Sequence, residues 1–213
     1  MIIITYNPMQ YTELAGQERV AKTALALKER NFEAVVVATK EEALEHIRQN
    51  IPAGASVNNG SSTTLSEIGF VDYLKAGDHT WNNLHEAILA ESDPVKQAEL
   101  RHQSVFAEYY LGSAHALTET GELVIASASG SQLPSLGFTS PNIILVVGTQ
   151  KIVPTLESAL ARVRDHVFPL ENERMKAAGM GGSVLAKILI LEQEPAFMNR
   201  KVKVILVNER LGF

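Results

Sequence analysis

The sequence predicts an α/β fold in which a largely parallel sheet is flanked by helices. Short apolar runs rich in β-branched residues alternate along the chain with longer segments whose apolar residues recur at helical spacing. Glycine, serine and proline separate the two kinds of segment. With 213 residues, of which 46% are hydrophobic, the chain can bury one core, and we expect a single domain over residues 1–213.

The first half of the chain predicts a helix followed by strand–helix repeats. The pattern from Glu13 to Arg30 is that of an amphipathic helix. The elements expected next are the strand "FEAVVVAT", the helix "KEEALEHIRQN", the strand "GASVNNG" and the helix "STTLSEIGFVDYLKAG". Residues 80–111 predict a helical hairpin that covers the sheet, because Asp93 and Pro94 fit the N-cap and first turn of a second helix.

The second half predicts further strands around one clear helix. The runs "GSAHALT", "GELVIASAS" and "NIILVVG" are expected to be strands of one sheet, and "PTLESALARVRDHV" an amphipathic helix. A proline and a glycine cluster predict an extended loop or mobile lid over 168–182. "KILILEQE" and "KVKVILVNE" predict a closing β-hairpin. A small lobe or lid within 80–111 and 168–186 is compatible with these patterns.

Composition and charge exclude several classes of function. The formal net charge is −5 and no long Lys/Arg block occurs, which argues against a nucleic-acid surface. The absence of cysteine excludes disulfides, thiolate nucleophiles and iron–sulfur ligation by this chain, and the six dispersed histidines have no metal-ligand spacing. These observations predict no metal site. No apolar run reaches the roughly 18 residues of a membrane span, so we expect a cytoplasmic protein.

One candidate binding site is the glycine and hydroxyl loop in "SVNNGSSTTLSEIG". A glycine permits close backbone approach, and hydroxyls beside a helix start can donate to an anion. The candidate ligand-binding residues here are Asn59, Gly60, Ser61, Ser62, Thr63 and Thr64. The alternative is that a serine of this loop only caps a helix, and the spacing alone favours neither interpretation. Neither a Walker loop nor a dinucleotide fingerprint is present.

The segment "SAHALTETGELV" supplies the candidate catalytic residues. His115 stands at an expected strand end, and Glu119 and Glu122 flank a glycine turn. Glu119 would serve as an acid/base or nucleophile if burial raised its pKa, with His115 orienting it. The alternative is a hydrogen-bonded structural histidine and two solvated glutamates.

Cationic side chains provide a further candidate. Lys151 follows a glycine at the end of the apolar run in "NIILVVGTQK", where it could meet a phosphate or carboxylate or remain a solvated loop residue. Glu171, Arg174 and Lys176 allow the same two interpretations. We include Lys151 among the candidate ligand-binding residues.

Four segments together resemble the lactate-utilisation (LUD) domain family. "NNGSSTTLSEIG" looks like the family's Gly-Ser-x-Thr-Leu-x-Glu-Ile-Gly segment, and "SAHALTETGELV" looks like its Asn-Ala-Ile-Thr-x-x-Gly segment. "PNIILVVGTQKIVPTLESALARVR" and "VKVILVNERLGF" match in order and spacing, so the resemblance covers most of residues 15–213.

The resemblance implies a fold like that of ribose-5-phosphate isomerase and the CoA-transferases. In those relatives the corresponding loop holds a phosphate or acyl-carrier group. Members of the LUD family act in oxidation of L-lactate to pyruvate beside iron–sulfur partner proteins. The resemblance therefore implies a phosphate- or carboxylate-bearing small molecule as ligand, no cofactor in this chain, and no nucleic-acid or membrane partner; a homo-oligomer is compatible with it.

Two departures from the family pattern set limits on the resemblance. Gly130, Ser131 and Gln132 stand where many relatives have Gly-Asn-Arg, and His115 replaces an asparagine. The 179–188 segment has no cysteine and places Lys187 near an expected acid. The alternatives are thus a non-catalytic assembly subunit of a lactate-oxidising system, or an isomerase or transferase acting on sugar phosphates or CoA esters.

Overall fold

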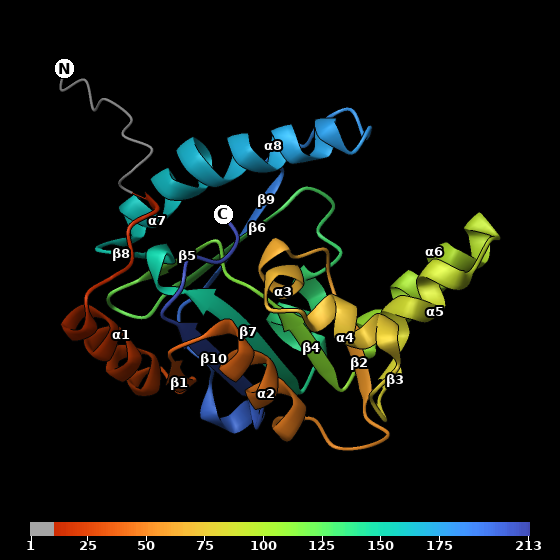
Figure 1. Ribbon diagram of the computed structural model, residues 1–213, viewed down its shortest axis with the longest axis horizontal. Helices are drawn as coiled ribbons and strands as arrows, with labels where there is room; N and C mark the ends of the chain where they lie inside the picture. Colours follow the sequence, from red (N-terminus) through yellow and green to blue (C-terminus); the bar gives the residue numbers. More distant parts are fainter. Residues whose placement is uncertain (1–10) are drawn as a thin grey trace.

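Two β-sheets and the helices around them make up the computed structural model, which describes residues 11–213 (Figure 1). The larger sheet has the order β1-β10-β7-β4-β2-β3, and all of its strand pairs are parallel. Its strands are β1 (Glu33–Val37), β2 (Ser56–Asn59), β3 (Asn82–Asn83), β4 (Tyr109–Gly112), β7 (Asn142–Gly148) and β10 (Lys201–Val207). This arrangement confirms the predicted α/β class with a parallel sheet.

A smaller mixed sheet follows the order β8-β5-β6-β9. Its strands are β5 (Ala116–Thr118), β6 (Leu123–Ser127), β8 (Ile152–Val153) and β9 (Lys187–Leu191). β6 is antiparallel to both β5 and β9, whereas β5 and β8 are parallel. The three runs expected to lie in one sheet are therefore divided, since 142–148 belongs to the larger sheet and the other two to the smaller one.

Two helices, α1 (Gln17–Glu29) and α2 (Lys40–Asn50), cover opposite faces of the larger sheet. The other described helices lie around the two sheets and are α3 (Thr63–Glu67), α4 (Phe70–Ala76), α5 (Leu84–Ala90), α6 (Pro94–Gln103), α7 (Leu156–Arg162) and α8 (Phe168–Ala177). Side chains of β7 alternate between two buried clusters: Leu145 packs in the cluster that contains Leu27 of α1, and Val146 in the one that contains Ile47 of α2. None of the described helices is long and apolar enough to cross a membrane.

The expected helix over residues 62–77 is interrupted. Gly69 adopts the left-handed conformation with φ 79°, which ends α3 and begins α4. Ser62 caps α3, because its hydroxyl accepts a hydrogen bond from the Leu65 N–H at 3.3 Å.

The helical hairpin is confirmed as α5 and α6. The Asp93 carboxylate caps α6 by accepting from the Val95 N–H at 2.9 Å, and Pro94 occupies the first turn. The pair projects away from the larger sheet rather than covering it (Figure 1), and α6 has no buried residue. Its predicted role as a cover is therefore wrong.

The predicted C-terminal β-hairpin is wrong. β9 lies at the edge of the smaller sheet, whereas β10 lies in the larger sheet between β1 and β7. The reason is that β10 is apolar on both of its faces: Val204 and Leu206 belong to one buried cluster, and Ile205 and Val207 to the other. Strands buried on both faces are typical of the interior of a parallel sheet.

The segment expected to be an extended loop over 168–182 begins as a helix. α7, a π-helical turn over Val163–Val167 and α8 follow one another without a break. Pro169 has no N–H to donate to the preceding turn, and the π-helical turn directly before it lets the chain remain helical around the proline. This continuous helix brings Phe168, Glu171, Arg174 and Met175 to the site described next.

Candidate functional site

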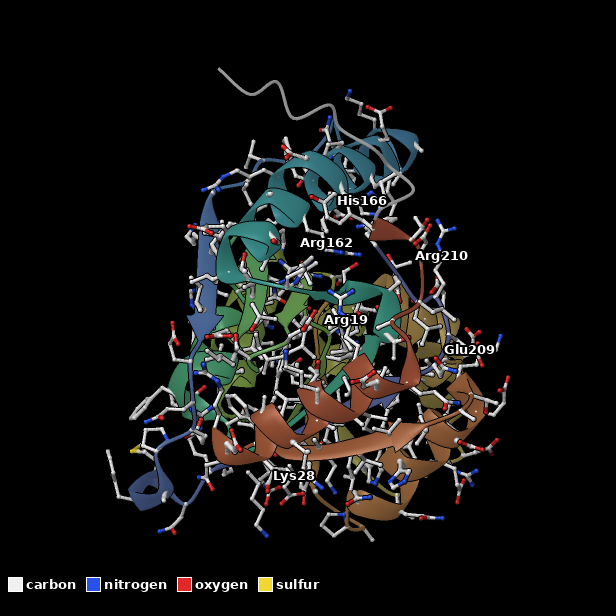
Figure 2. All side chains as sticks on the ribbon, turned by 90° about the vertical axis from the view of Figure 1, so that its left-hand side faces the viewer. Arg19, Lys28, Arg162, His166, Glu209 and Arg210 are labelled. Atoms are coloured by element: carbon white, nitrogen blue, oxygen red, sulfur yellow. The ribbon has the colours of Figure 1, made fainter. Side chains whose placement is uncertain are left out.

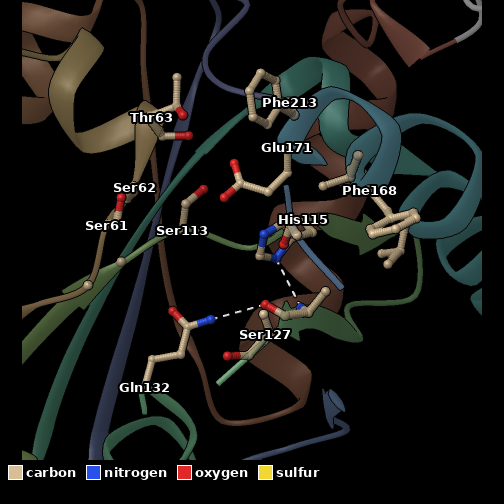
Figure 3. A pocket seen from close by; sticks show the side chains of 18 of the residues that line it. Ser61, Ser62, Thr63, Ser113, His115, Ser127, Gln132, Phe168, Glu171 and Phe213 are labelled. Carbon is tan, nitrogen blue, oxygen red and sulfur yellow. Dashed lines mark hydrogen bonds between the residues drawn. The ribbon is translucent and has the colours of Figure 1, made fainter. Parts of the chain in front are cut away.

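A cavity of about 340 Å³ lies at the carboxyl ends of the parallel strands. Its wall includes the loop after β2, the residues after β4 and the 3-10 turn after β7, together with residues of α8 and the end of β6. The carboxyl ends of parallel strands are the usual ligand sites of such sheets. Figure 3 labels several residues of the wall, among them Ser113, His115 and Glu171.

Lys151 is the most buried charged side chain of the cavity wall, with 2% of its surface exposed. Its Nζ donates to the Thr64 hydroxyl at 3.0 Å and to the Ser113 hydroxyl at 3.1 Å. No carboxylate of the described residues lies within ion-pair distance of it. Burial, and secondarily the nearby Arg162 guanidinium, lower the pKa of Lys151 to about 7.

Arg162 supports the cavity from behind. Its side chain is fully buried in the interior of the molecule (Figure 2). The guanidinium donates to the backbone carbonyls of His115 and Phe213, the latter at 3.2 Å. These bonds fix two wall segments, and the buried positive charge disfavours protonation of its neighbours.

His115 lines the cavity in its neutral form. Its Nδ1 accepts a hydrogen bond from the Ala126 N–H at 3.0 Å, which places the proton of the neutral ring on Nε2. Burial, followed by the Lys151 and Arg162 charges, lowers the pKa of His115 to about 3. At neutral pH the ring can therefore donate a hydrogen bond to a ligand but does not carry charge.

The hydroxyl loop forms one side of the cavity. Gly60, Ser61, Ser62, Thr63 and Thr64 all line it. Ser62 caps α3, so the capping interpretation holds for that residue. Among the described residues, the hydroxyls of Ser61 and Thr63 have no hydrogen-bond partner, which leaves them able to bind a ligand.

The wall opposite the loop includes α8. Glu171 and Arg174 both line the cavity, and Figure 3 shows the Glu171 carboxylate pointing into it near Ser113 and His115. Glu171 also accepts from Arg174 at 2.7 Å through both of its oxygens. A carboxylate and a guanidinium are thus present at the cavity, paired with each other.

A family model for the LUD domain matches residues 20–207. The chain belongs to the LUD domain family. A solved structure of a DUF162 family protein from Deinococcus radiodurans is similar to this LUD-domain protein with a TM-score of 0.57. The likeness covers 92% of this chain and 100% of that chain at 14% identity, so it supports the fold alone. No curated protein matches the chain.

The structure brings together most of the predicted site residues of this LUD-domain protein. His115, Lys151 and residues 60–64 all line the same cavity. Asn59 does not, because it lies at the end of β2 and its amide donates to the Gly60 carbonyl at 3.2 Å. Lys176 is also outside the wall and pairs with Glu173.

Glu119 is not brought to the cavity. The β5–β6 turn carries it to α1, where its carboxylate meets Arg19 at 2.7 Å and Lys22 at 3.0 Å. The hydrogen bond from Lys22, with the nearby Arg19 charge, holds the pKa of Glu119 below its usual range, opposite to the raised pKa that an acid/base role required. We therefore withdraw its pairing with His115 and the hydroxyl loop.

The two segments that depart from the family pattern also meet the cavity. Gln132 lines it and donates to the Ala126 carbonyl at 3.1 Å, so the wall has a neutral amide at this position. Ser183, Val184 and Leu185 contribute from the second segment. Lys187 does not line the cavity, since its Nζ donates to the Ala128 carbonyl at 3.3 Å.

Several wall residues were not predicted as site residues. Glu171 and Arg174 have the i, i+3 spacing of a helical ion pair, but Pro169 concealed the helix that carries them. Ser113 lies two positions before His115 within a segment already singled out, and that proximity is a usable signal. Nothing in the sequence alone indicates that Ser127 or Phe213 reaches the cavity.

Proposed function

We propose that this LUD-domain protein binds a small carboxylate or phosphate ligand in the cavity and serves in lactate utilisation. The observation that carries the proposal is the environment of Lys151. A buried amine with hydroxyl partners, and without a carboxylate partner among residues 11–213, favours an anion as its counter-charge. An anion bound beside Nζ also raises the pKa of the amine, so that ligand and ammonium stabilise each other.

The hydroxyl loop supplies the remaining contacts in this proposal. Ser61 and Thr63 are placed to donate to oxygen atoms of the ligand. Lys151 lines the same cavity, and its hydrogen bonds to the Thr64 and Ser113 hydroxyls hold its amine in place. A cavity of about 340 Å³ accommodates a three-carbon acid such as L-lactate or pyruvate with room for a larger ligand. The family name supports the choice of lactate and pyruvate as the first ligands to test.

Thermal-shift titrations of the full chain with L-lactate, pyruvate and inorganic phosphate test the proposal. We expect at least one of these anions to raise the Tm in a saturable way. Lys151→Met is expected to weaken the binding about tenfold or more, equivalent to about 1.4 kcal/mol. Lys75→Met is the matched control, because Lys75 is an exposed lysine of α4 and does not line the cavity.

Two outcomes of such titrations would contradict parts of the proposal. Equal rises in Tm in the wild type and in Lys151→Met would show that Lys151 does not contribute to ligand binding. Stabilisation by sugar phosphates or CoA esters alone would favour an isomerase or transferase related to the fold. The first outcome overturns the role of Lys151, and the second overturns the lactate assignment.

A non-catalytic assembly role is the second candidate, and the neutral Gln132 in the cavity wall favours it. A pocket that has lost a cation binds anions less tightly, which is compatible with a protein whose main task is to hold partners. No response to any of the anions, together with stoichiometric co-purification of an iron–sulfur protein, would support this role over ligand binding.

A further inference from the structure

Lys151 combines three features that anion binding alone does not explain. Its amine lies in a cavity wall, it is 2% exposed, and it is held by two hydroxyls instead of a carboxylate. We propose that Lys151 is a nucleophile that forms a covalent imine with a 2-oxo acid bound in this cavity. The inference rests on the proposed function, because the same hydroxyl loop is to hold the carboxylate of that acid.

The hydrogen bonds of Lys151 suit a neutral amine. A neutral primary amine has two N–H groups and one lone pair. The two N–H groups are accounted for by Thr64 at 3.0 Å and Ser113 at 3.1 Å. Among the described residues no third polar partner of Nζ occurs, which leaves the lone pair for an electrophile in the cavity.

Both hydroxyls remain satisfied in this arrangement. Thr64 donates to the Leu211 carbonyl at 3.5 Å, and Ser113 donates to the Ala114 carbonyl at 3.1 Å. Each hydroxyl proton is therefore directed away from Nζ, and each hydroxyl oxygen faces it as an acceptor. The pair orients the amine without protonating it.

The charged groups around Lys151 come from three helices. Arg162 of α7 lowers its pKa and Glu67 of α3 raises it, while Glu171 and Arg174 of α8 line the same cavity as an ion pair. His115 is neutral. With burial as the largest cause, the balance brings the pKa of Lys151 to about 7, so a large fraction of the amine is unprotonated near neutrality. A desolvated lysine beside another cation is an established kind of activated amine.

The reaction needs no oxidant or reductant. The Nζ lone pair attacks the ketone carbon, and a proton moves from nitrogen to the former carbonyl oxygen to give a carbinolamine. The carbon–oxygen bond then breaks, the hydroxyl leaves as water, and the nitrogen forms the double bond to carbon. One amine and one ketone thus yield one imine and one water.

Glu171 is the group placed to carry the protons of this sequence. Figure 3 shows its carboxylate directed into the cavity near the Ser113 hydroxyl, which in turn contacts Nζ. It can accept the proton that nitrogen releases and return it to the departing hydroxyl. Arg174, at 2.7 Å, holds the carboxylate in place before the first transfer and after the second.

Reductive trapping tests the proposal on the full chain. The protein is incubated with saturating pyruvate and sodium cyanoborohydride, and the intact mass and the proteolytic peptides are measured. We expect one reduced pyruvate adduct per chain, located on Lys151. Lys151→Arg should lose it, whereas Lys187→Arg, the matched control beside but outside the cavity, should keep it.

The pH dependence separates this lysine from ordinary ones. The initial trapping rate at subsaturating pyruvate, which reports the ligand-free protein, should rise through about pH 7 and level off near pH 8, whereas exposed lysines continue to gain reactivity toward pH 10. Glu171→Gln should slow trapping about tenfold or more while Lys151 remains the labelled residue.

The failure of this inference is distinguishable from that of the proposed function. L-lactate has no ketone group, so a lactate-dependent rise in Tm with no pyruvate adduct on Lys151 overturns the imine and leaves anion binding intact. Adducts spread over exposed lysines also overturn it. Because the peptide map of the wild type locates the adduct, the conclusion stands even if Lys151→Arg does not fold.

Discussion

At the scale of single residues, the burial of Lys151 in the cavity wall lowers the folding stability of the protein. Its pKa of about 7 in the folded state lies below the ordinary lysine value of 10.5. Between these two values the unfolded chain binds more protons, so stability rises with pH across the window from 7 to 10.5 and is lowest below it. Binding sites often contain such unfavourable groups.

Lys151→Met is therefore expected to be more stable than the wild type at pH 7. Methionine removes the cost of the buried amine and keeps a similar volume, and the Thr64 and Ser113 hydroxyls retain their backbone acceptors. We expect a gain of about 1 kcal/mol, or roughly 3 °C in Tm. Thermal melts from pH 6 to 10 check this: the difference from the wild type should shrink as the pH rises. A less stable variant with an unchanged pH profile contradicts it.

At the scale of secondary structure, the π-helical turn between α7 and α8 decides where Glu171 and Arg174 point. Val163–Val167 contains the wider turn, and the Phe168 N–H donates to the Val163 carbonyl across it. A π-helical turn rotates everything that follows relative to a regular helix. The cavity-lining face of α8 thus depends on a proline nearby in sequence.

Pro169→Ala tests this dependence. Alanine restores a backbone N–H and favours a regular α-helical turn, so we expect about 1 kcal/mol of added helix stability. The same change should rotate Glu171 and Arg174 away from the cavity and weaken anion binding about tenfold. Pro154→Ala is the control, since Pro154 precedes α7, is exposed and does not line the cavity. An unchanged anion affinity in Pro169→Ala would show that the π-helical turn does not determine the geometry of the site.

The same element explains a limit of sequence reasoning. Pro169 and the glycine cluster after it predicted irregular structure, because proline ordinarily ends a helix. A π-helical turn has no periodicity that a short sequence window reveals, so α8 was missed, and Glu171 and Arg174 were left open between ligand contacts and solvated loop residues. The hydroxyl loop and Lys151, in contrast, were predicted because each follows an apolar strand at a glycine, and parallel strand ends meet at one edge of a sheet.

At the scale of the whole molecule, the segment after β10 connects distant parts of the fold. The Gly212 N–H donates to Glu67 at 2.6 Å, the Leu211 carbonyl accepts from Gln150 at 2.8 Å, and the Phe213 carbonyl accepts from Arg162. These partners come from three different stretches of the chain. The segment therefore holds the strand-end loops in their places around the cavity.

Gly212→Ala should destabilise this arrangement by more than the backbone strain of a left-handed alanine accounts for. A Cβ at Gly212 would lie 2.4 Å from the Thr64 hydroxyl oxygen and 3.1 Å from Lys151 Nζ, at a φ of 61°. Gly179→Ala is the matched control, because φ is 74° there and no atom lies within 4 Å. We expect the control to lose about 1 kcal/mol and Gly212→Ala to lose about 2 kcal/mol more, with loss of anion binding. Equal losses in urea unfolding would mean that the contact is unimportant.

Contacts between distant segments also mark what the sequence did not reveal. Glu119 meets Arg19 and Lys22 across about a hundred positions of sequence, and local patterns contain no information on that approach. β10 was paired with its neighbour β9 for the same reason, although the apolar character of both of its faces indicated an interior strand. The α/β class followed from local periodicity, whereas strand order depends on contacts that periodicity does not encode.

The position of β10 has a consequence for how the protein is made. Translation delivers β1, β2, β3, β4 and β7 first, and β10 then inserts between β1 and β7. Until residues 201–207 leave the ribosome, β1 has no neighbour in the sheet and the apolar edge of β7 is unprotected. Such edges bind chaperones and aggregate. We therefore expect these edges of the nascent chain to stay exposed until β10 pairs with them.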